Sequence, residues 1–355
     1  MWVKDRLPFT GLRPYTHRAD KGECSMRILV VGGSGLIGYH LLPRLCGAGH
    51  EVVSVTRGER PLADDRVQHV RADRHDLAAL ATGLGGAFDA VIDNVAYQPD
   101  DALSLLGLLE GRVGRYVLTS TAFVYNGLEE ALTSPHRPFR EDDPHVPSAD
   151  GETRPGDAHA SYVVGKQRLE EALTGVTDIP LTIVRPLLQI VGENTNDGRF
   201  EWFWRRVAGG GPIWLPDDAR EKAGPCQLSY SGDVAAVLAA VATSDEPLTG
   251  AFNVGQPELW TYEEYVRLMG GVAGREVRIR YAPRSELDAL VGGTYHIPLP
   301  YPVAFDVSRS LALTNDAPTP MRTWIEAVAT WFDHHLPVVT PSWYAARALE
   351  LGKER

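Results

Sequence analysis

The sequence has few cysteines and no run of positive charge. Its three cysteines, Cys24, Cys46 and Cys226, are odd in number and show neither C-x-x-C nor metal-ligand spacing, so we expect neither a disulfide framework nor a metal site. The formal net charge is −11, and lysine and arginine do not cluster. Because nucleic-acid affinity comes largely from neutralising phosphates, no nucleic-acid partner is expected.

Long hydrophobic runs are also missing. No apolar run is long enough to cross a bilayer, which argues against a membrane partner. Residues 1–25 lack the continuous apolar stretch of a signal peptide, are mildly basic and contain several turn-forming residues. We therefore expect an N-terminal extension outside the fold, with Met26 as a candidate start and a functional arm as the alternative. The whole pattern predicts a cytoplasmic protein.

From residue 26 onward, apolar runs alternate with helical patterns. Buried strands are expected at RILVVGG, EVVSVTRG, VQHVRAD, FDAVIDNVA, RYVLTSTAFVY and LTIVRPLL. Strands that alternate with helices predict an α/β fold, with a doubly wound parallel sheet of the Rossmann type. After Pro186 this rhythm breaks, and aromatic residues, glycines and prolines predict a smaller C-terminal substrate lobe.

The expected domain boundaries follow from this change of pattern. A dinucleotide-binding domain should span residues 26–187, with 227–255 returning to its sheet. The substrate lobe should take 188–226 and 256–340, including an amphipathic helix at RTWIEAVATWFDHHL. Residues 341–355 are expected to form a C-terminal tail.

Three glycines follow the first expected strand and open the helix after it. In VGGSGLIG, Gly32 allows a tight turn, Gly35 lets a pyrophosphate approach the backbone, and Gly38 lets the helix pack closely on the strand. The N-terminus of that helix, with Leu36 and Ile37, faces the phosphates with its partial positive charge. The spacing is G-x-x-G-x-x-G, and its place between a strand and a helix predicts a dinucleotide site.

Residues after the next strands indicate how the cofactor would be held. Arg57 follows the second strand, where NAD enzymes usually carry an acidic residue for the ribose 2′-hydroxyl, so a 2′-phosphate and hence NADP(H) is favoured. Glu59 lies close by and keeps NAD(H) possible, and Arg57 could instead stack on adenine. Asp73 is placed to reach the adenine amino group or to cap a helix beginning at His75. Asn94–Ala96 should bring backbone near the cofactor.

Tyr162 and Lys166, in SYVVGKQRLEEAL, form the second informative motif. A free phenol has a pKa near ~10, and a lysine at i+4 lies on the same helix face, where its charge favours the phenolate. The ammonium can also bond the nicotinamide ribose. Thr121, with Ser120 beside it, would align the substrate oxygen while Tyr162 exchanges the hydroxyl proton and hydride crosses to or from C4 of the nicotinamide. Joined to the glycine motif, this pattern predicts oxidoreductase chemistry.

From Met26 to about residue 335, these motifs resemble those of extended short-chain dehydrogenase/reductases of the NAD-dependent epimerase/dehydratase family. The matching features are VGGSGLIG, STAFVY, Tyr162 with Lys166, VRP at 184–186, SGDVA at 231–235 and FNVG at 252–255. The segments TRG and DAVIDNVAYQPDDA further resemble the branch that contains the chloroplast stem-loop-binding proteins and their bacterial epimerase-like relatives.

The resemblance implies catalytic roles for Tyr162, Lys166 and Thr121 and a place beside the cofactor for Pro186. It also implies a homodimer, in which the helices carrying Leu103–Leu109 and Tyr162–Leu173 pack against their two-fold mates.

Two departures from the family pattern narrow the expected chemistry. Sugar-nucleotide 4,6-dehydratases carry an Asp-Glu pair directly after the catalytic Thr, where this chain has Ala122 and Phe123. Nucleotide-sugar epimerases usually place an Arg for the diphosphate seven residues before the position of Asp233, where this chain has Cys226. The candidates to replace that arginine are Arg199, Arg205 and Arg206.

The sequence therefore predicts an NAD(P)-dependent oxidoreductase or epimerase, with Tyr162 as general acid/base. Its substrate is expected to be a small molecule, sugar-like or a nucleotide sugar, that reacts at a hydroxyl or keto carbon. One alternative is an NADPH-dependent ketoreductase of a natural-product-type substrate, because reduction and epimerisation use the same residues. An alternative from another class is a catalytically silent, cofactor-sensing or RNA-associated binding protein.

Overall fold

The computed structural model of the chain describes most of its length. The described residues are 25–131, 136–145, 157–176, 178–194, 198–217, 219, 226–295, 297, 302–314, 317–335 and 346–353. The expected N-terminal extension therefore lies, apart from Ser25, outside the described residues. Within the described part, no helix combines the length and apolar composition needed to span a membrane.

Seven parallel strands form the central sheet, in the order β10-β6-β5-β4-β1-β2-β3. The strands are β1 (Arg27–Val31), β2 (Glu51–Thr56), β3 (Gln68–Arg71), β4 (Ala90–Asp93), β5 (Tyr116–Thr119), β6 (Leu181–Pro186) and β10 (Gly250–Val254). Strand order reverses direction at β1, which is the arrangement of a doubly wound sheet with its ligand crevice at the switch point. The predicted fold class is confirmed.

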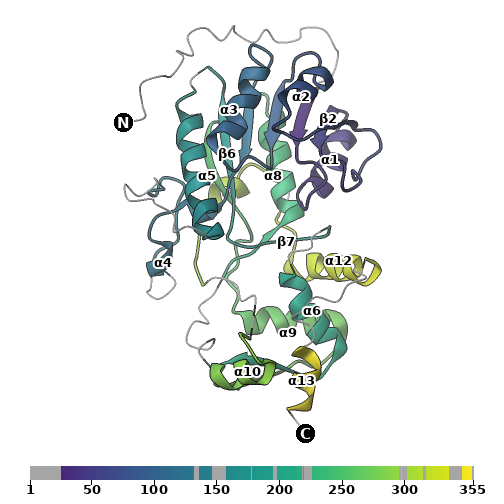
Figure 1. Cartoon of the computed structure of the whole chain (residues 1–355), viewed down its shortest axis with the longest axis vertical. Coiled ribbons are helices and arrows are strands. Elements are labelled where there is room, and N and C mark those ends of the chain that lie inside the picture. The colour runs from purple at the N-terminus through teal and green to yellow at the C-terminus, as the bar shows by residue number, and fades with distance from the viewer. Residues whose placement is uncertain are drawn as a thin grey trace.

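Helices cover both faces of this sheet (Figure 1). Along β1, Ile28 and Val30 face the helices α1 (Gly38–Gly47) and α8 (Ser231–Thr243), whereas Leu29 and Val31 face the opposite layer. That second layer contains α2 (Leu77–Gly83), α3 (Pro99–Leu108) and α5 (Ala158–Thr174). Because side chains alternate across a strand, burial of both faces explains why the strands are continuous apolar runs in the sequence.

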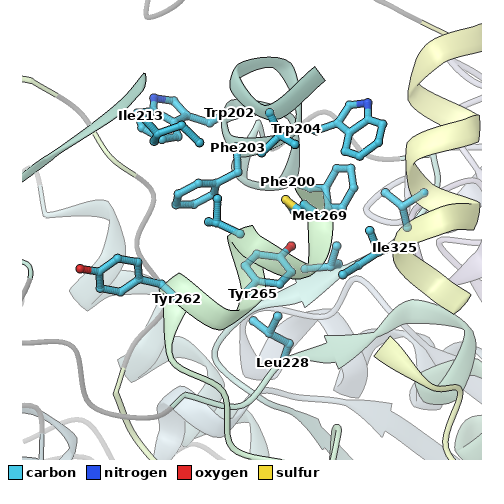
Figure 2. Close-up of a cluster of buried hydrophobic side chains, with 14 of the residues drawn as sticks. Phe200, Trp202, Phe203, Trp204, Ile213, Leu228, Tyr262, Tyr265, Met269 and Ile325 are labelled. Carbon is cyan, nitrogen blue, oxygen red and sulfur yellow. The ribbon is translucent and has the colours of Figure 1, made fainter. Parts of the chain in front are cut away.

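A second lobe lies beyond the carboxyl ends of the strands (Figure 1). Its elements are α6 (Arg199–Gly209), β8 (Pro212–Pro216), α9 (Tyr262–Ala273), β11 (Arg278–Ala282), α10 (Arg284–Val291) and α12 (Met321–His334). β8 and β11 pair in parallel, and aromatic side chains such as Phe200, Trp202 and Tyr265 fill the core between the helices (Figure 2). Shorter elements are η1 (Ala122–Val124), α4 (Leu128–Ala131), the paired strands β7 (Ile190–Val191) and β9 (Ser229–Tyr230), and α11 (Ser308–Leu311).

The segment expected to be a C-terminal tail contains a helix, α13 (Ala346–Gly352), that docks on the second lobe (Figure 1). The Glu350 carboxylate is buried there and accepts hydrogen bonds from Arg206 Nη2 at 2.6 Å, Arg347 Nη1 at 2.9 Å and the Tyr295 hydroxyl at 2.7 Å. A short helix held by buried charge rather than by an apolar stripe gives little periodic signal in the sequence, and the tail expectation was wrong for this reason.

Candidate active site

The glycine-rich loop between β1 and α1 is shaped by contacts that exclude side chains. Gly32 has φ +86°, and a Cβ there would lie 2.6 Å from Val95 Cγ1. A Cβ on Gly38 would lie 2.1 Å from the Gly33 carbonyl oxygen, so this glycine allows α1 to approach the loop. At Gly35, by contrast, the nearest atom to such a Cβ is 3.8 Å away, which leaves the surface beside it open. The loop is tight where it packs and open where a phosphate would lie.

The N-terminus of α1 adds the charge that this opening needs. No described side chain caps the helix, and its first turn contains no acidic residue. Its first backbone N–H groups therefore lack the side-chain acceptors that usually satisfy them, and they carry the positive end of the helix dipole. Such a terminus binds anions, and a diphosphate fits this place.

A cavity of about 540 Å³ extends from this loop along the carboxyl ends of the strands. Its lining residues include Gly32, Gly35 and Tyr97, together with Arg57 and Asp73, whose part of the cavity is called the adenosine end after the sequence expectation. The structure thus brings four of the predicted cofactor residues to one cavity.

At the adenosine end, Arg57 and Glu59 bind each other. Arg57 Nη2 lies 3.1 Å from Glu59 Oε2, and the two side chains are 65% and 67% exposed. Asp73 lines the cavity, and its Oδ1 accepts a hydrogen bond from the His75 N–H at 2.9 Å. The expected helix does not begin at His75, because Asp76 caps it and α2 begins at Leu77. Asp73 shapes the turn before that helix.

The floor of the cavity contains a buried charge network that sequence reasoning missed. Arg74 Nη1 and Nη2 donate to the two carboxylate oxygens of Asp93 at 2.9 and 3.0 Å, and the Tyr116 hydroxyl donates to Asp93 Oδ2 at 2.7 Å. Arg74 Nη2 also reaches the Asp101 carbonyl oxygen at 2.6 Å. The available signal was an arginine directly after Asp73 and an aspartate at the end of β4, the next strand along the chain.

Lys166 lies at the buried end of the site. Its side chain is 2% exposed, and Nζ donates hydrogen bonds to the Ala96 carbonyl oxygen at 2.6 Å and the Thr119 carbonyl oxygen at 2.9 Å. Burial lowers the pKa of Lys166 to about 8, although the carboxylates of Asp93 and Glu170 favour its charged form. An ammonium has three N–H donors, so one remains for a ligand.

The Thr121 hydroxyl lies close enough to Tyr162 to affect the pKa of its phenol. Burial raises the pKa of Tyr162, while the Thr121 hydroxyl and the charge of Arg199 act in the opposite direction. Lys166 Nζ lies 6.0 Å from the centre of the Tyr162 ring and is bound to backbone carbonyls. The expectation that Lys166 directly favours the phenolate does not match this geometry, in which Tyr162 is a protonated phenol at neutral pH.

Tyr97 is a second phenol that the sequence reasoning did not single out. Its ring centre lies 6.1 Å from that of Tyr162 and 4.9 Å from Lys166 Nζ, and its side chain is 47% exposed where it lines the cavity. Gly165 has no Cβ to strike the Tyr97 carbonyl oxygen, which would be 2.6 Å from it, so α5 can approach this loop. Tyr97 therefore connects the cofactor cavity with the Thr121–Tyr162 pair.

Two buried polar atoms at this end have no partner within the described residues. Asn94 Oδ1 accepts from the Thr119 hydroxyl at 2.7 Å, but Asn94 Nδ2 is unpaired, and so is Ser120 Oγ. Because buried donors without partners are costly, these atoms fit a site that is completed by a polar ligand. Pro186 ends β6 at the same edge of the sheet but lies outside the cavity lining, and so do Leu36, Ile37 and Gly38.

The three arginines considered as candidates to contact a substrate diphosphate differ in their surroundings. Arg206 is buried in the α13 contact, and Arg205 Nε donates to Glu201 Oε1 at 2.6 Å. Arg199, at the start of α6, is the one of the three whose charge acts on Tyr162. Cys226 is buried, and its backbone pairs with Trp260.

Comparisons with known proteins agree with this geometry. The model of the NAD dependent epimerase/dehydratase family matches residues 28–255. The chain is 25% identical over 278 residues to the chloroplast stem-loop binding protein of 41 kDa b of Arabidopsis thaliana, covering 73% of this chain and 67% of that protein. It is 26% identical over 287 residues to a UDP-N-acetyl-alpha-D-glucosaminuronate decarboxylase of Bacillus cytotoxicus, covering 72% and 83%.

Among solved structures, the Bordetella bronchiseptica enzyme WbmG in complex with NAD and UDP has a similar fold. Its TM-score is 0.64 at 19% identity, with 88% of this chain and 95% of that chain covered. Because the family match spans most of the sheet domain and includes the glycine loop, Thr121, Tyr162 and Lys166, the assignment does not depend on fold alone. The chain belongs to the NAD-dependent epimerase/dehydratase family.

Proposed function

We propose that this protein is an NAD(P)-dependent oxidoreductase acting at a hydroxyl or keto carbon of a sugar-like or nucleotide-sugar substrate. The observation that carries the proposal is the meeting of Thr121, Tyr162 and Lys166 next to a cavity that begins at a phosphate-binding loop. The substrate class is supported by the family and by the similarity to a UDP-sugar decarboxylase.

Each residue has a role that follows from its protonation and position. A bound nicotinamide supplies or accepts the hydride. Tyr162, held protonated by burial, donates its proton to the carbonyl oxygen during reduction and receives it back during oxidation. Thr121, which lies close to the phenol, orients the same oxygen, and the third N–H of Lys166 is available to a ribose hydroxyl.

The preference for NADP(H) over NAD(H) rests on Arg57. A 2′-phosphate would replace Glu59 as the partner of Arg57, whereas the free 2′-hydroxyl of NAD(H) would bond the Glu59 carboxylate. Arg60 also lines this end of the cavity and adds a second positive charge. We therefore keep NADP(H) as the proposed cofactor and NAD(H) as the alternative that Glu59 permits.

A net ketoreductase is the second candidate. It is favoured by Ala122 and Phe123, which replace the acid and base needed for elimination of water. Free exchange of NADP(H) with solution during turnover would favour the reductase, and a cofactor retained through purification would favour the epimerase. Binding of a structured RNA without any turnover would support the binding-protein alternative instead.

A homodimer and a cytoplasmic location are further parts of the proposal. α3 and α5 lie side by side, and Leu103 and Val163 on them are only partly buried within one chain. Packing of these helices against a two-fold mate would cover both side chains. Light scattering at micromolar concentration tests this, and a monomeric mass would contradict it.

The direct test of the proposed function is to identify what the protein carries and converts. Mass spectrometry of small molecules released from the purified protein should show a nicotinamide dinucleotide. Incubation with nucleotide sugars and keto sugars should then give turnover that depends on it. Absence of dinucleotide binding in the wild type would contradict the proposal.

A further inference from the structure

The chain returns to the glycine-rich loop where it enters the second lobe. β7 lies at the junction of the two parts (Figure 1), and the three residues after it, Gly192–Asn194, form what we call the strap. Asn194 Nδ2 donates hydrogen bonds to the Ser34 carbonyl oxygen at 3.1 Å and the Gly35 carbonyl oxygen at 3.4 Å. The second lobe thus contacts the backbone that is expected to hold the diphosphate.

Asn194 adopts a conformation that its neighbours must stabilise. Its φ is +61°, and among the described residues it is the one non-glycine residue with positive φ. Asparagine tolerates this region better than most residues, but the conformation still has an energetic cost. Backbone strain of this kind persists where the surrounding structure enforces it, and it is frequent at functional sites.

The other two strap residues are fitted as closely. A Cβ on Gly192 would lie 1.8 Å from Ser231 Oγ and 3.1 Å from Leu36 Cδ1, so the strap passes directly over the start of α1. The buried Glu193 carboxylate accepts from the Tyr230 hydroxyl at 3.1 Å and lies 2.9 Å from His40 Nε2 on α1. A side chain at Gly192 would therefore clash with Ser231, and substitution of Glu193 or Asn194 would remove hydrogen bonds.

These contacts determine the direction of the neighbouring N–H groups. In a planar trans peptide, the C=O and the following N–H point to opposite sides. Holding the Ser34 oxygen toward Asn194 turns the Gly35 N–H away from the strap, and holding the Gly35 oxygen does the same for the Leu36 N–H. Ser34 and Gly35 line the cavity, and Asn194 is not among its lining residues.

The strap also reaches the adenosine end of the cavity. Arg60, which lines that end, donates from Nη1 to the Asn194 carbonyl oxygen at 3.3 Å. One residue of the second lobe therefore contacts both the phosphate loop and a cation of the cofactor cavity.

We propose that Asn194 is a positioning residue for the dinucleotide, whose amide holds the Ser34 and Gly35 peptide groups so that the adjoining N–H groups face the diphosphate. This inference rests on the proposed function in one respect, namely that the cavity takes a dinucleotide. Without the amide, the Ser34–Gly35 peptide loses the hydrogen bond that orients it, whereas the Gly35 carbonyl oxygen still accepts from the Tyr39 N–H at 3.0 Å. Ordering the freed peptide again reduces affinity for the diphosphate. Affinity for adenosine alone, which lacks phosphates, should not change.

The test compares two ligands on matched variants. Asn194→Gly keeps the left-handed backbone and removes the amide, so its dissociation constant for ADP-ribose, measured by calorimetry, should rise about tenfold from loss of the two hydrogen bonds. The dissociation constant for adenosine should stay at the wild-type value. Asn194→Asp also tolerates this φ but offers only acceptors and a negative charge, so it should weaken ADP-ribose binding further. Asn126→Gly, at an exposed position outside the cavity, is the control and should match the wild type.

Thermal unfolding of the ligand-free variants separates positioning from general stability. We expect the melting temperature of Asn194→Gly to stay close to that of Asn126→Gly while ADP-ribose binding differs. Equal ADP-ribose affinity in Asn194→Gly and wild type, or an equal loss for adenosine and ADP-ribose, would overturn the inference and leave the proposed function standing. A wild type that binds no dinucleotide would overturn both.

Discussion

Two parts of the proposed cofactor site, the adenosine end of the cavity and the surroundings of Lys166, contain charged groups in opposite environments. At the adenosine end, Arg57 and Glu59 pair in solvent, each about two-thirds exposed. At the catalytic end, Lys166 is 2% exposed and is held by the carbonyls of two strands. An exposed pair can exchange partners at little cost, whereas a buried ammonium is fixed by the strands around it. The exposed end suits cofactor selection and the buried end suits chemistry.

A buried ion pair between α5 and β6 contrasts with the exposed Arg57–Glu59 pair in the same way. Glu170 lies one turn after Lys166 on α5, and its carboxylate is bound by Arg185 of β6 at 2.5 and 3.1 Å. Both side chains are 1% exposed, and Arg185 also donates to the Tyr125 hydroxyl at 2.9 Å. This pair joins the helix that carries Tyr162 to the sheet.

The largest effect is expected from breaking that buried pair. Glu170→Ala leaves the Arg185 guanidinium buried without its carboxylate, which should lower the free energy of unfolding by about 3–5 kcal/mol. Glu59→Ala, in the exposed pair, is the matched control and should change it by less than about 1 kcal/mol. Urea denaturation of both variants makes the measurement, and equal effects would remove the contrast between the two ends.

Removing the Tyr162 hydroxyl should have the next largest effect, on the turnover rate rather than on the stability of the fold. Tyr162→Phe keeps the ring and loses the proton donor, so kcat should fall by roughly 10²-fold or more. The dissociation constant for the dinucleotide should change little, because Tyr162 lies outside the cavity lining. Steady-state kinetics and a cofactor titration test both parts, and a wild-type kcat would exclude Tyr162 from the mechanism.

At the exposed end, Arg57→Asp should reverse the cofactor preference. NADP(H) should bind the wild type about ten- to a hundredfold more tightly than NAD(H), the value of a charge-assisted hydrogen bond. The substituted carboxylate would repel the 2′-phosphate and accept a bond from the 2′-hydroxyl. Titration of both cofactors into both proteins decides the point. If both the wild type and the variant bind NADP(H) and NAD(H) with equal affinity, Arg57 does not contact the 2′-substituent of the ribose.

The smallest expected effect is a pH dependence of stability that comes from the buried Lys166. The folded pKa of Lys166, about 8, lies below its value of 10.5 in an unfolded chain. Between those values the unfolded chain holds more protons, so this residue's contribution to stability rises with pH, by at most about 1.4 kcal/mol per pH unit. The wild type should therefore gain stability relative to Lys166→Met between pH 8 and pH 9.5 in urea denaturation. A flat difference would mean that Lys166 titrates normally.

The two ends also differ in how far the sequence could predict them. The glycine loop, the strands and the meeting of Thr121, Tyr162 and Lys166 have short motifs in defined contexts, and the structure places those motifs as expected. The partners of buried charges have no such motif. Arg74 and Asp93 lie 19 residues apart and Arg206 and Glu350 lie 144 apart, so only the folded chain brings them together. Burial likewise raises the pKa of Tyr162, where the sequence predicted a phenolate favoured by Lys166.

The most direct test of the account follows the hydride itself. NAD(P)H carrying deuterium at C4 of the nicotinamide is incubated with the wild type, with Tyr162→Phe and with the substrate identified by mass spectrometry. For net reduction, the account predicts deuterium at the reacting carbon of the product with the wild type, and a rate at least about a hundredfold lower with the variant although it still binds the cofactor. For epimerisation, deuterium placed at the reacting carbon of the substrate should instead be retained in the product. Net reduction without deuterium transfer, an epimerised product that has lost the substrate deuterium, or equal rates for both proteins would contradict the account.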